Sequence, residues 1–174
     1  MPLILVTPLS ALEDMLRRYE PSHLITLLSP EFMIETPKGF PPERHLRIGV
    51  NDICDPSLGN SPPAEDHVAS LLEFSRGWDG AQPLLIHCWA GVSRSMAGAF
   101  SILCDRSRPG DETRIAREMR ARAPHAYPNR LLVRLADDLL VRGGKMLEAV
   151  EAMGPSVMVE EGKPVEFPLS EFGL

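Results

Sequence analysis

Four short apolar runs, each bounded by proline, glycine or polar residues, constrain the fold of this chain most strongly. They lie at Leu3-Val6, Leu24-Leu28, Leu46-Val50 and Leu84-Cys88. Runs of this length and composition are typical of strands that are buried on both faces, as in a parallel sheet. Parallel strands need long crossover connections, so helices are expected between them. The runs therefore predict the core of an α/β domain.

Helical patterns with one apolar face alternate with these runs and then follow them. They cover Leu9 to Arg18, Ala64 to Arg76, Ile115 to Arg122 and Arg130 to Val141. Leucines recur in the last of them at the spacing of a buried stripe. We therefore expect a central, mostly parallel sheet of about four to five strands, flanked by helices, with a helical C-terminal half.

Capping signals mark the starts of two of these helices. Asn60 or Ser61 is placed to cap the second, with Pro62 and Pro63 in first-turn positions whose nitrogen needs no partner. Asn129 is placed to cap the Leu-rich helix that follows it.

The length and composition favour a single domain. The chain has 174 residues, of which 44% are hydrophobic, which suffices for one substantial core. From Gly154 onward, prolines and glycines interrupt any periodicity. We therefore expect one domain over residues 1–153, followed by an extended tail over 154–174 that either lies on the domain or hangs free.

The charge and the cysteines exclude several classes of protein. The formal net charge of -6 disfavours binding to nucleic acid or to an anionic membrane. Cys54, Cys88 and Cys104 form no disulfide framework or zinc ribbon, and the histidines lack ligand spacing. No signal peptide or apolar spanning segment is apparent. We expect a cytoplasmic protein without metal or cofactor, and the oligomeric state stays open.

The chemistry is concentrated in the segment His87-Cys88-Trp89-Ala90-Gly91-Val92-Ser93-Arg94-Ser95, between a predicted strand and a predicted helix. A tight loop at such a junction directs successive backbone N–H groups inward, and the helix adds its positive N-terminus. Gly91 lets the backbone turn closely around a ligand. Residues Trp89, Ala90, Gly91, Val92 and Ser93 are therefore predicted to bind a phosphate group.

Two side chains of this segment complete the predicted chemistry. The loop amides, the helix dipole and Arg94 favour the thiolate of Cys88, which makes it a nucleophile. The spacing of five intervening residues returns the guanidinium of Arg94 to the mouth of the loop, where it can hold two phosphate oxygens. Ser95 can donate to the sulfur when it leaves. His87 points to the opposite strand face and is expected to shape the loop from the core.

The pattern His-Cys, five residues, Arg-Ser resembles the signature of the cysteine-dependent protein tyrosine phosphatases, in particular the compact, bacterial-type dual-specificity branch. The resemblance implies a phosphocysteine intermediate at Cys88 and an upstream aspartate as general acid. Asp52 has the spacing and the local sequence of that acid, and Asp55 is the alternative. Pro128-Asn129 resembles the helix start that follows the signature in this branch.

The expected function is hydrolysis of phosphoric monoesters, on protein phosphotyrosine or mixed phosphoprotein substrates. A phosphatase for a small phosphorylated molecule, such as a phosphoinositide, is one alternative. It is disfavoured because the loop residues between Cys88 and Arg94 include no lysine. A non-catalytic phosphate-binding module and a rhodanese-like sulfurtransferase are the others. Cys54 and Cys104 are read as small core residues, with a reversible Cys54–Cys88 disulfide as an alternative role for Cys54.

Overall fold

The computed structural model describes the whole chain, residues 1–174, as helices packed on one sheet. The sheet contains β1 (Leu3–Pro8), β2 (His23–Leu28), β3 (His45–Gly49), β4 (Leu84–Cys88) and β5 (Val165–Pro168). The helices are α1 (Leu12–Tyr19), α2 (Glu65–Arg76), α3 (Arg94–Asp105), α4 (Glu112–Arg122), α5 (Arg130–Leu139) and α6 (Lys145–Glu151). The predicted α/β class, the predominantly parallel sheet and the helical C-terminal half are confirmed.

The strand order places the end of β4 in the middle of the sheet. The order is β3-β2-β4-β1-β5, with the first four strands parallel and β5 antiparallel to β1. Cys88 is the last residue of β4 and pairs with Pro8 of β1. The carboxyl ends of parallel strands meet at one edge, which is where such sheets bind ligands. The loop after Cys88 therefore opens at this edge.

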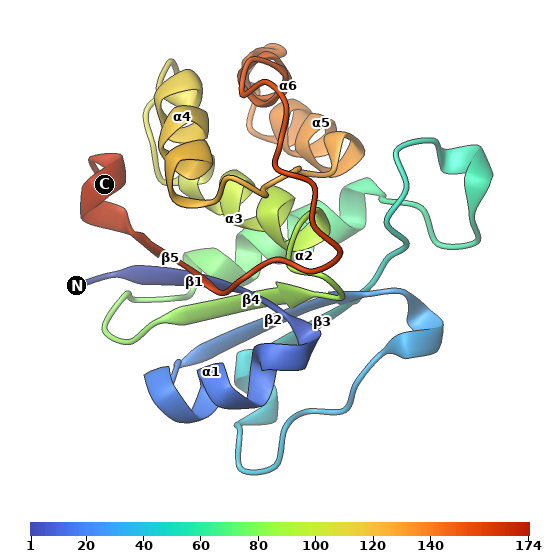
Figure 1. Ribbon diagram of the computed structural model, residues 1–174, viewed down its shortest axis with the longest axis vertical. Helices are drawn as coiled ribbons and strands as arrows, with labels where there is room; N and C mark the ends of the chain where they lie inside the picture. Colours follow the sequence, from blue (N-terminus) through green and yellow to red (C-terminus); the bar gives the residue numbers. More distant parts are fainter.

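The two faces of the sheet are covered unequally. Figure 1 shows α1 on one face and the other helices on the opposite face. Alternate residues of a strand enter different cores, so Ile4 and Val6 pack in the main cluster beneath the helices, while Leu5 packs with α1. The same alternation turns Cys88 toward the helices and His87 toward the other face.

The segment after Gly154, predicted as an extended tail, packs on the domain. Residues 165–168 form β5, which pairs with β1 along the edge of the sheet. Phe167 and Phe172 are fully buried against the main core. Burial of two aromatic side chains favours docking of this segment over a free tail. Figure 1 shows both chain termini on the same side of the molecule.

The start of α2 also differs from the prediction. The helix begins at Glu65, and Ala64, rather than Asn60 or Ser61, is the residue that precedes it. The backbone N–H of Ala64 donates to His67 Nδ1 at 3.2 Å. The side chain of His67 satisfies a group at the helix start, and Pro62 and Pro63 lie before the helix. The predicted cap at Asn129 is confirmed, because its Oδ1 accepts from the N–H of Leu132 at 3.0 Å.

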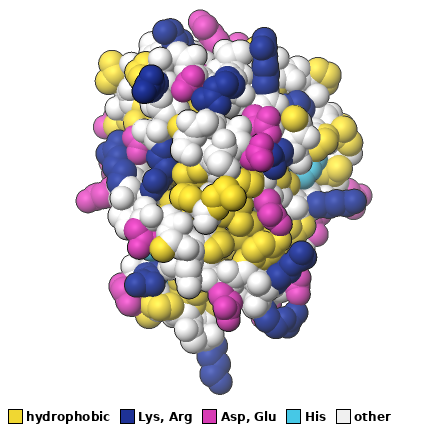
Figure 2. Space-filling view, turned by 90° about the vertical axis from the view of Figure 1, so that its left-hand side faces the viewer, with side chains coloured by type: hydrophobic (Ala, Val, Ile, Leu, Met, Phe, Trp, Pro, Cys, Tyr) yellow, Lys and Arg dark blue, Asp and Glu magenta, His cyan; other side chains and the backbone are white.

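One face of the surface has a distinct pattern. Figure 2 shows hydrophobic side chains gathered near the centre of the face that carries the termini, with basic and acidic side chains interspersed around them. Neither sign of charge dominates this face, in keeping with the modest net charge of -6. None of the six helices is both long and apolar enough to cross a lipid bilayer.

Candidate active site

The loop between β4 and α3 holds its carbonyl groups outward. Four of its carbonyl oxygens accept bonds from outside the loop: Trp89 O from Leu9 N at 3.0 Å, Ala90 O from Gly162 N at 2.8 Å, Val92 O from Tyr127 N at 2.9 Å and Ser93 O from Asn129 N at 3.3 Å. All peptide bonds are trans. A trans peptide places its C=O and the next N–H on opposite sides, so the N–H groups that follow these carbonyls face the loop interior.

The loop interior is therefore lined by N–H donors. No protein acceptor bonds the N–H groups of residues 89–93, and the first N–H groups of α3 add to them. Gly91 has φ +70, and a Cβ at this position would lie 2.7 Å from Pro8 N and 2.9 Å from Thr7 C. Only glycine allows this loop to pack so closely on the end of β1.

Cys88 lies at the base of the loop. Its side chain is buried, and its Sγ lies 3.1 Å from Ser95 Oγ. The sulfur thus has a hydroxyl neighbour that is able to donate to a thiolate. Cys88 ends a fully buried strand, and Ser95 lies in the first turn of α3, so two rigid elements fix this contact.

Arg94 is oriented by the ends of neighbouring strands. Its Nη1 donates to Val50 O at 2.8 Å and to Ser29 Oγ at 3.4 Å, and the side chain is buried. Its Nε is also buried and has no hydrogen-bond partner. The guanidinium therefore keeps donor capacity for an oxyanion, as the bidentate recognition of phosphate requires.

Asp52 lies over the same loop. Its Oδ1 accepts from Ser93 Oγ at 2.6 Å and from Asn129 Nδ2 at 2.9 Å, and its Oδ2 lies 3.8 Å from Arg94 Nε. The side chain remains 37% exposed. A residue 36 positions before the nucleophile in the chain is thus brought beside the loop by a pair of specific donors.

The alternative acid, Asp55, bonds to its own neighbour in the chain and not to the loop after β4. It is fully exposed, and its carboxylate accepts from both the backbone N–H and the hydroxyl of Ser57. These hydrogen bonds lower the pKa of Asp55, which makes it a weaker proton donor. Cys54 is an exposed free thiol beside Arg130 and Arg134, so its prediction as a core residue is wrong, whereas Cys88 and Cys104 are buried.

His87 supports the loop from the opposite face of β4. Its Nδ1 lies 3.4 Å from Cys88 O, and its Nε2 lies 2.7 Å from Thr26 Oγ1, which is also 2.8 Å from His45 Nε2. A carbonyl only accepts, so Nδ1 of His87 carries the proton and Thr26 donates to Nε2. Thr26 then accepts from His45, whose Nδ1 accepts from Thr36 Oγ1 at 3.0 Å. One directed chain of hydrogen bonds thus joins β3, β2 and β4.

In a comparison with solved structures, 21 chains match the fold of this chain. One is DUSP15, at 18% identity and a TM-score of 0.57, with 88% of this chain and 91% of the other covered. Another is the human tyrosine phosphatase-like serine/threonine/tyrosine-interacting protein, at 19%, a TM-score of 0.58, and coverage of 81% and 93%. This chain has the dual-specificity phosphatase fold.

A protein with a bound phosphoinositide also shares this fold. PTPMT1, whose structure was solved in complex with PI(5)P, matches at 14% identity with a TM-score of 0.55, covering 87% of this chain and 94% of the other. No protein-family model matches this chain, and no curated protein matches its sequence. The residues of the site therefore carry the functional argument beyond the fold.

An aromatic pair borders the loop between β4 and α3, residues 89–93, called the phosphatase loop below after the fold. Trp89 and Phe32 are about half exposed, and their ring centroids lie 5.3 Å apart at 57°. They line a cavity of about 160 Å³ together with Leu28, Ser29 and Arg94. The two rings form an apolar wall beside Arg94.

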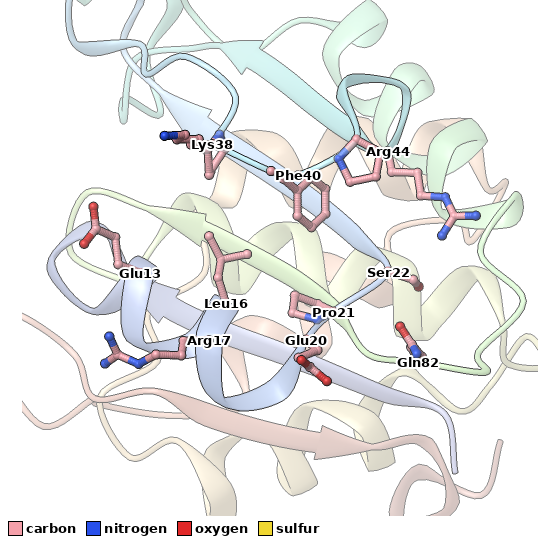
Figure 3. Close-up of a pocket in the computed structure, with 13 residues that line it drawn as sticks. Glu13, Leu16, Arg17, Glu20, Pro21, Ser22, Lys38, Phe40, Arg44 and Gln82 are labelled. Atoms are coloured by element: carbon pink, nitrogen blue, oxygen red, sulfur yellow. The ribbon is translucent and has the colours of Figure 1, made fainter.

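A larger cavity lies elsewhere. It measures about 620 Å³ and runs between α1 and the loop around Phe40, with Leu16 and Phe40 near its centre and charged side chains of both signs around them (Figure 3). No residue of the phosphatase loop lines it, nor does Asp52. Its size alone does not connect it with the candidate chemistry.

Sequence patterns did not indicate several residues that organise the site. Ser29 and the carbonyl of Val50 orient Arg94, and Thr26 joins two histidines. The clearest missed signal was the polar Thr26 within an otherwise apolar strand, since a buried hydroxyl needs a partner. The roles of Ser29 and Val50 depend on tertiary packing and have no local signature.

Proposed function

We propose that this protein is a metal-independent phosphoric monoester hydrolase of the tyrosine and dual-specificity type, with Cys88 as its nucleophile. The observation that supports this most directly is the loop itself. Its N–H groups have no protein acceptor, Cys88 is buried at its base, and Arg94 Nε is buried without a partner. A tetrahedral dianion is the ligand that such a set of donors fits best.

The first step would transfer the phosphoryl group to sulfur. The thiolate of Cys88 attacks phosphorus, and the bond from phosphorus to the leaving oxygen breaks. Asp52 donates a proton to that oxygen, so the product leaves as an alcohol or a phenol. Arg94 and the loop amides stabilise the charge on the three equatorial phosphate oxygens.

The second step would hydrolyse the phosphocysteine. Asp52, now a carboxylate, takes a proton from water as the water oxygen attacks phosphorus. The sulfur–phosphorus bond breaks, and Ser95 Oγ, 3.1 Å from the sulfur, donates to the departing thiolate. Inorganic phosphate keeps the second proton of the water and is released. The proton that Asp52 took from the water restores its acid form, and Cys88 is again a thiolate.

A non-catalytic phosphate-binding role is the second candidate. It is favoured by the match to a protein that is named phosphatase-like and interacting, which indicates that this fold alone does not establish catalysis. The presence of both Cys88 and Arg94, together with the placement of Asp52 by two donors, favours an enzyme instead.

The substrate class follows from the charge and shape of the mouth. Residues 89–93 add no positive side chain to the loop, so a substrate with several phosphates gains little there. Trp89 and Phe32 supply an apolar wall next to Arg94. We infer a phosphoprotein substrate with a single phosphate in the site, and a soluble, cytoplasmic setting for it.

Hydrolysis of p-nitrophenyl phosphate tests the proposal. The wild-type protein is expected to be active in EDTA and inhibited by vanadate, whereas Cys88→Ser abolishes turnover. Cys54→Ser is the matched control, because Cys54 is an exposed free thiol outside the loop, and it should retain full activity. Activity that is lost in EDTA and persists in Cys88→Ser contradicts the proposal.

A panel of phosphotyrosine and phosphothreonine peptides and a phosphoinositide distinguishes the substrate alternatives. We expect higher kcat/KM for the peptides than for the phosphoinositide. The reverse order would favour the small-molecule alternative while keeping the mechanism. Binding of the peptides without any release of phosphate would instead support the non-catalytic module.

A further inference from the structure

The segment between α6 and β5 crosses the phosphate-binding loop. We call residues 154–162 the C-terminal strap. Figure 1 shows it descending from α6 toward the carboxyl ends of the parallel strands before it turns into β5. The strap has no regular secondary structure, and most of it is exposed. Its end is an exception, because Gly162 is buried.

Three groups of contacts hold the strap along its length. Arg120 donates to Gly154 O at 3.3 Å and also to Pro124 O at 2.7 Å, so it joins the strap to the turn after α4. The N–H of Val157 donates to Pro124 O at 2.9 Å. Ser10 Oγ donates to Glu161 Oε1 at 2.7 Å. The strap is thus fixed on both sides of the loop.

Gly162 makes the contact between the strap and the loop after β4. Its N–H donates to Ala90 O at 2.8 Å. This carbonyl and the N–H of Gly91 belong to the same peptide plane and point in opposite directions. A bond that holds the carbonyl outward therefore holds the Gly91 N–H inward, toward the position of a bound phosphate.

Space rather than conformation requires glycine at 162. The backbone φ of Gly162 lies outside the left-handed region, so an alanine would be allowed by its torsion angles. A Cβ would however lie 2.6 Å from both Cδ2 and Nε2 of His125 and 3.2 Å from Ala90 O. Any side chain at 162 must move either the histidine or the strap.

His125 cannot yield easily. Its side chain is 8% exposed, and its Nε2 is buried without a hydrogen-bond partner. The turn that carries it is held at Ala126, whose carbonyl accepts from Arg120 at 2.8 Å, and at Tyr127, whose N–H donates to Val92 O at 2.9 Å. The histidine therefore acts as a fixed stop behind the strap.

We propose that Gly162 is a positioning residue of the phosphate site, through which the C-terminal strap sets the orientation of the Ala90–Gly91 peptide. This inference rests on the proposed function of the loop. It assigns the strap a part in the binding of the phosphate oxygens, from a place in the chain about 70 residues beyond the signature.

Gly162→Ala tests this inference. The added Cβ pushes the strap from the loop, so we expect the inhibition constant for vanadate to rise about tenfold or more, where complete removal of an oxyanion donor costs about 10²–10³. The pH at which Cys88 reacts half-maximally with iodoacetamide should also rise, because an inward N–H no longer favours the thiolate. Gly77→Ala is the control, since a Cβ there meets only Phe74 O at 3.4 Å.

A second substitution separates positioning from a general loss of stability. His125→Ala removes the ring that the new Cβ would strike, so the double variant His125→Ala, Gly162→Ala should regain most of the vanadate affinity lost in Gly162→Ala. Equal vanadate inhibition of Gly162→Ala and the wild type would overturn the proposal. The proposal would also be overturned if the double variant bound vanadate as weakly as Gly162→Ala while its melting temperature equalled that of the wild type.

Hydrogen exchange on the unaltered protein provides a test that needs no variant to fold. Coupling between sites is reciprocal, so vanadate should slow exchange in the strap as well as in residues 88–95. Slower exchange in the loop with an unchanged strap would overturn this proposal and leave the proposed function intact. Absence of any vanadate effect on the loop would count against the proposed function itself. In that case, the comparison of Cys88 alkylation between Gly162→Ala and the wild type would decide whether Gly162 positions the loop.

Discussion

At the scale of single residues, the two oxygens of Asp52 have different surroundings. Oδ1 accepts from both Ser93 and Asn129, whereas Oδ2 has no donor within hydrogen-bond distance and lies 3.8 Å from Arg94 Nε. A proton on the carboxyl group is therefore placed most easily on Oδ2. This oxygen lies on the side of Arg94, the guanidinium of which would hold the phosphate.

Asp52→Ala should slow turnover in a way that depends on the leaving group. General acid catalysis contributes about 10²–10⁴ in rate, and it matters most when the leaving oxygen is basic. We expect a loss of about 100-fold or more in kcat for phosphothreonine peptides and a smaller loss for p-nitrophenyl phosphate. Steady-state kinetics on both substrates measure it.

Asp55→Ala is the control for this assignment. The carboxylate of Asp55 is bonded to Ser57 and contacts no group of the phosphatase loop, so kcat should stay close to that of the wild type. If Asp55→Ala shows the dependence on the leaving group and Asp52→Ala does not, Asp52 is not the acid.

At the scale of elements, the start of α5 serves two purposes. Asn129 Oδ1 caps the helix through the N–H of Leu132, while its Nδ2 donates to Asp52 Oδ1 and to Ile53 O. One side chain thus couples the first turn of a helix to the segment that carries the candidate acid. The two functions are separable because they use different atoms.

Asn129→Asp separates the two purposes. Aspartate keeps the acceptor of the cap, but it removes the amide donor and buries a second carboxylate beside Asp52, so repulsion should lower stability while kcat for poor leaving groups falls about tenfold. Asn129→Ala removes both contacts and should also cost about 1 kcal/mol of unfolding free energy. Urea unfolding and kinetics measure the two effects. Equal kcat for Asn129→Asp and the wild type would contradict this role.

The hydrogen-bond chain across three strands predicts sensitivity to acid. Burial lowers the pKa of His87 and of His45 from the usual 6.5 to about 4. Between these values the unfolded chain binds protons that the folded chain does not, so stability is full above pH 6.5 and falls as the pH drops toward 4. For His87 alone, the loss between pH 7 and pH 5 is about 2 kcal/mol.

Unfolding by urea at pH 7 and pH 5 checks this expectation. The midpoint of unfolding should fall as the pH is lowered in the wild type. The difference in unfolding free energy between pH 7 and pH 5 should be about 2 kcal/mol smaller in His87→Gln, because glutamine cannot take up the proton. His87→Gln with the same pH dependence as the wild type would show that His87 does not titrate as its burial requires.

At the scale of the whole molecule, the sequence was most informative where local pattern and packing agree. Strands β1, β2 and β4 are nearly continuous apolar runs, because both faces of each are covered, whereas β3 lies at the edge of the sheet and includes the exposed Arg47. The positions of all four parallel strands were predictable to within two residues. The loop from Cys88 to Ser95 was also predictable, since a cradle of this kind needs fixed residues at fixed spacing.

The remainder depends on contacts between distant segments. Prolines and glycines concealed β5, although Val165, Phe167 and Leu169 alternate as in a strand with one buried face. The role of Gly162 was invisible, because it arises from the closeness of His125 and Ala90, which lie far away in the chain. Local patterns carry no record of such neighbours.

The central claim is that Cys88 is the nucleophile within a ring of peptide N–H groups. The most direct measurement is mass spectrometry of the protein quenched during turnover of p-nitrophenyl phosphate, with Asp52→Ala used to slow the second step. The account predicts a single phosphoryl group on the peptide that contains Cys88, and none in Cys88→Ser. A phosphoryl group on another residue, or turnover in Cys88→Ser at the wild-type rate, would contradict it.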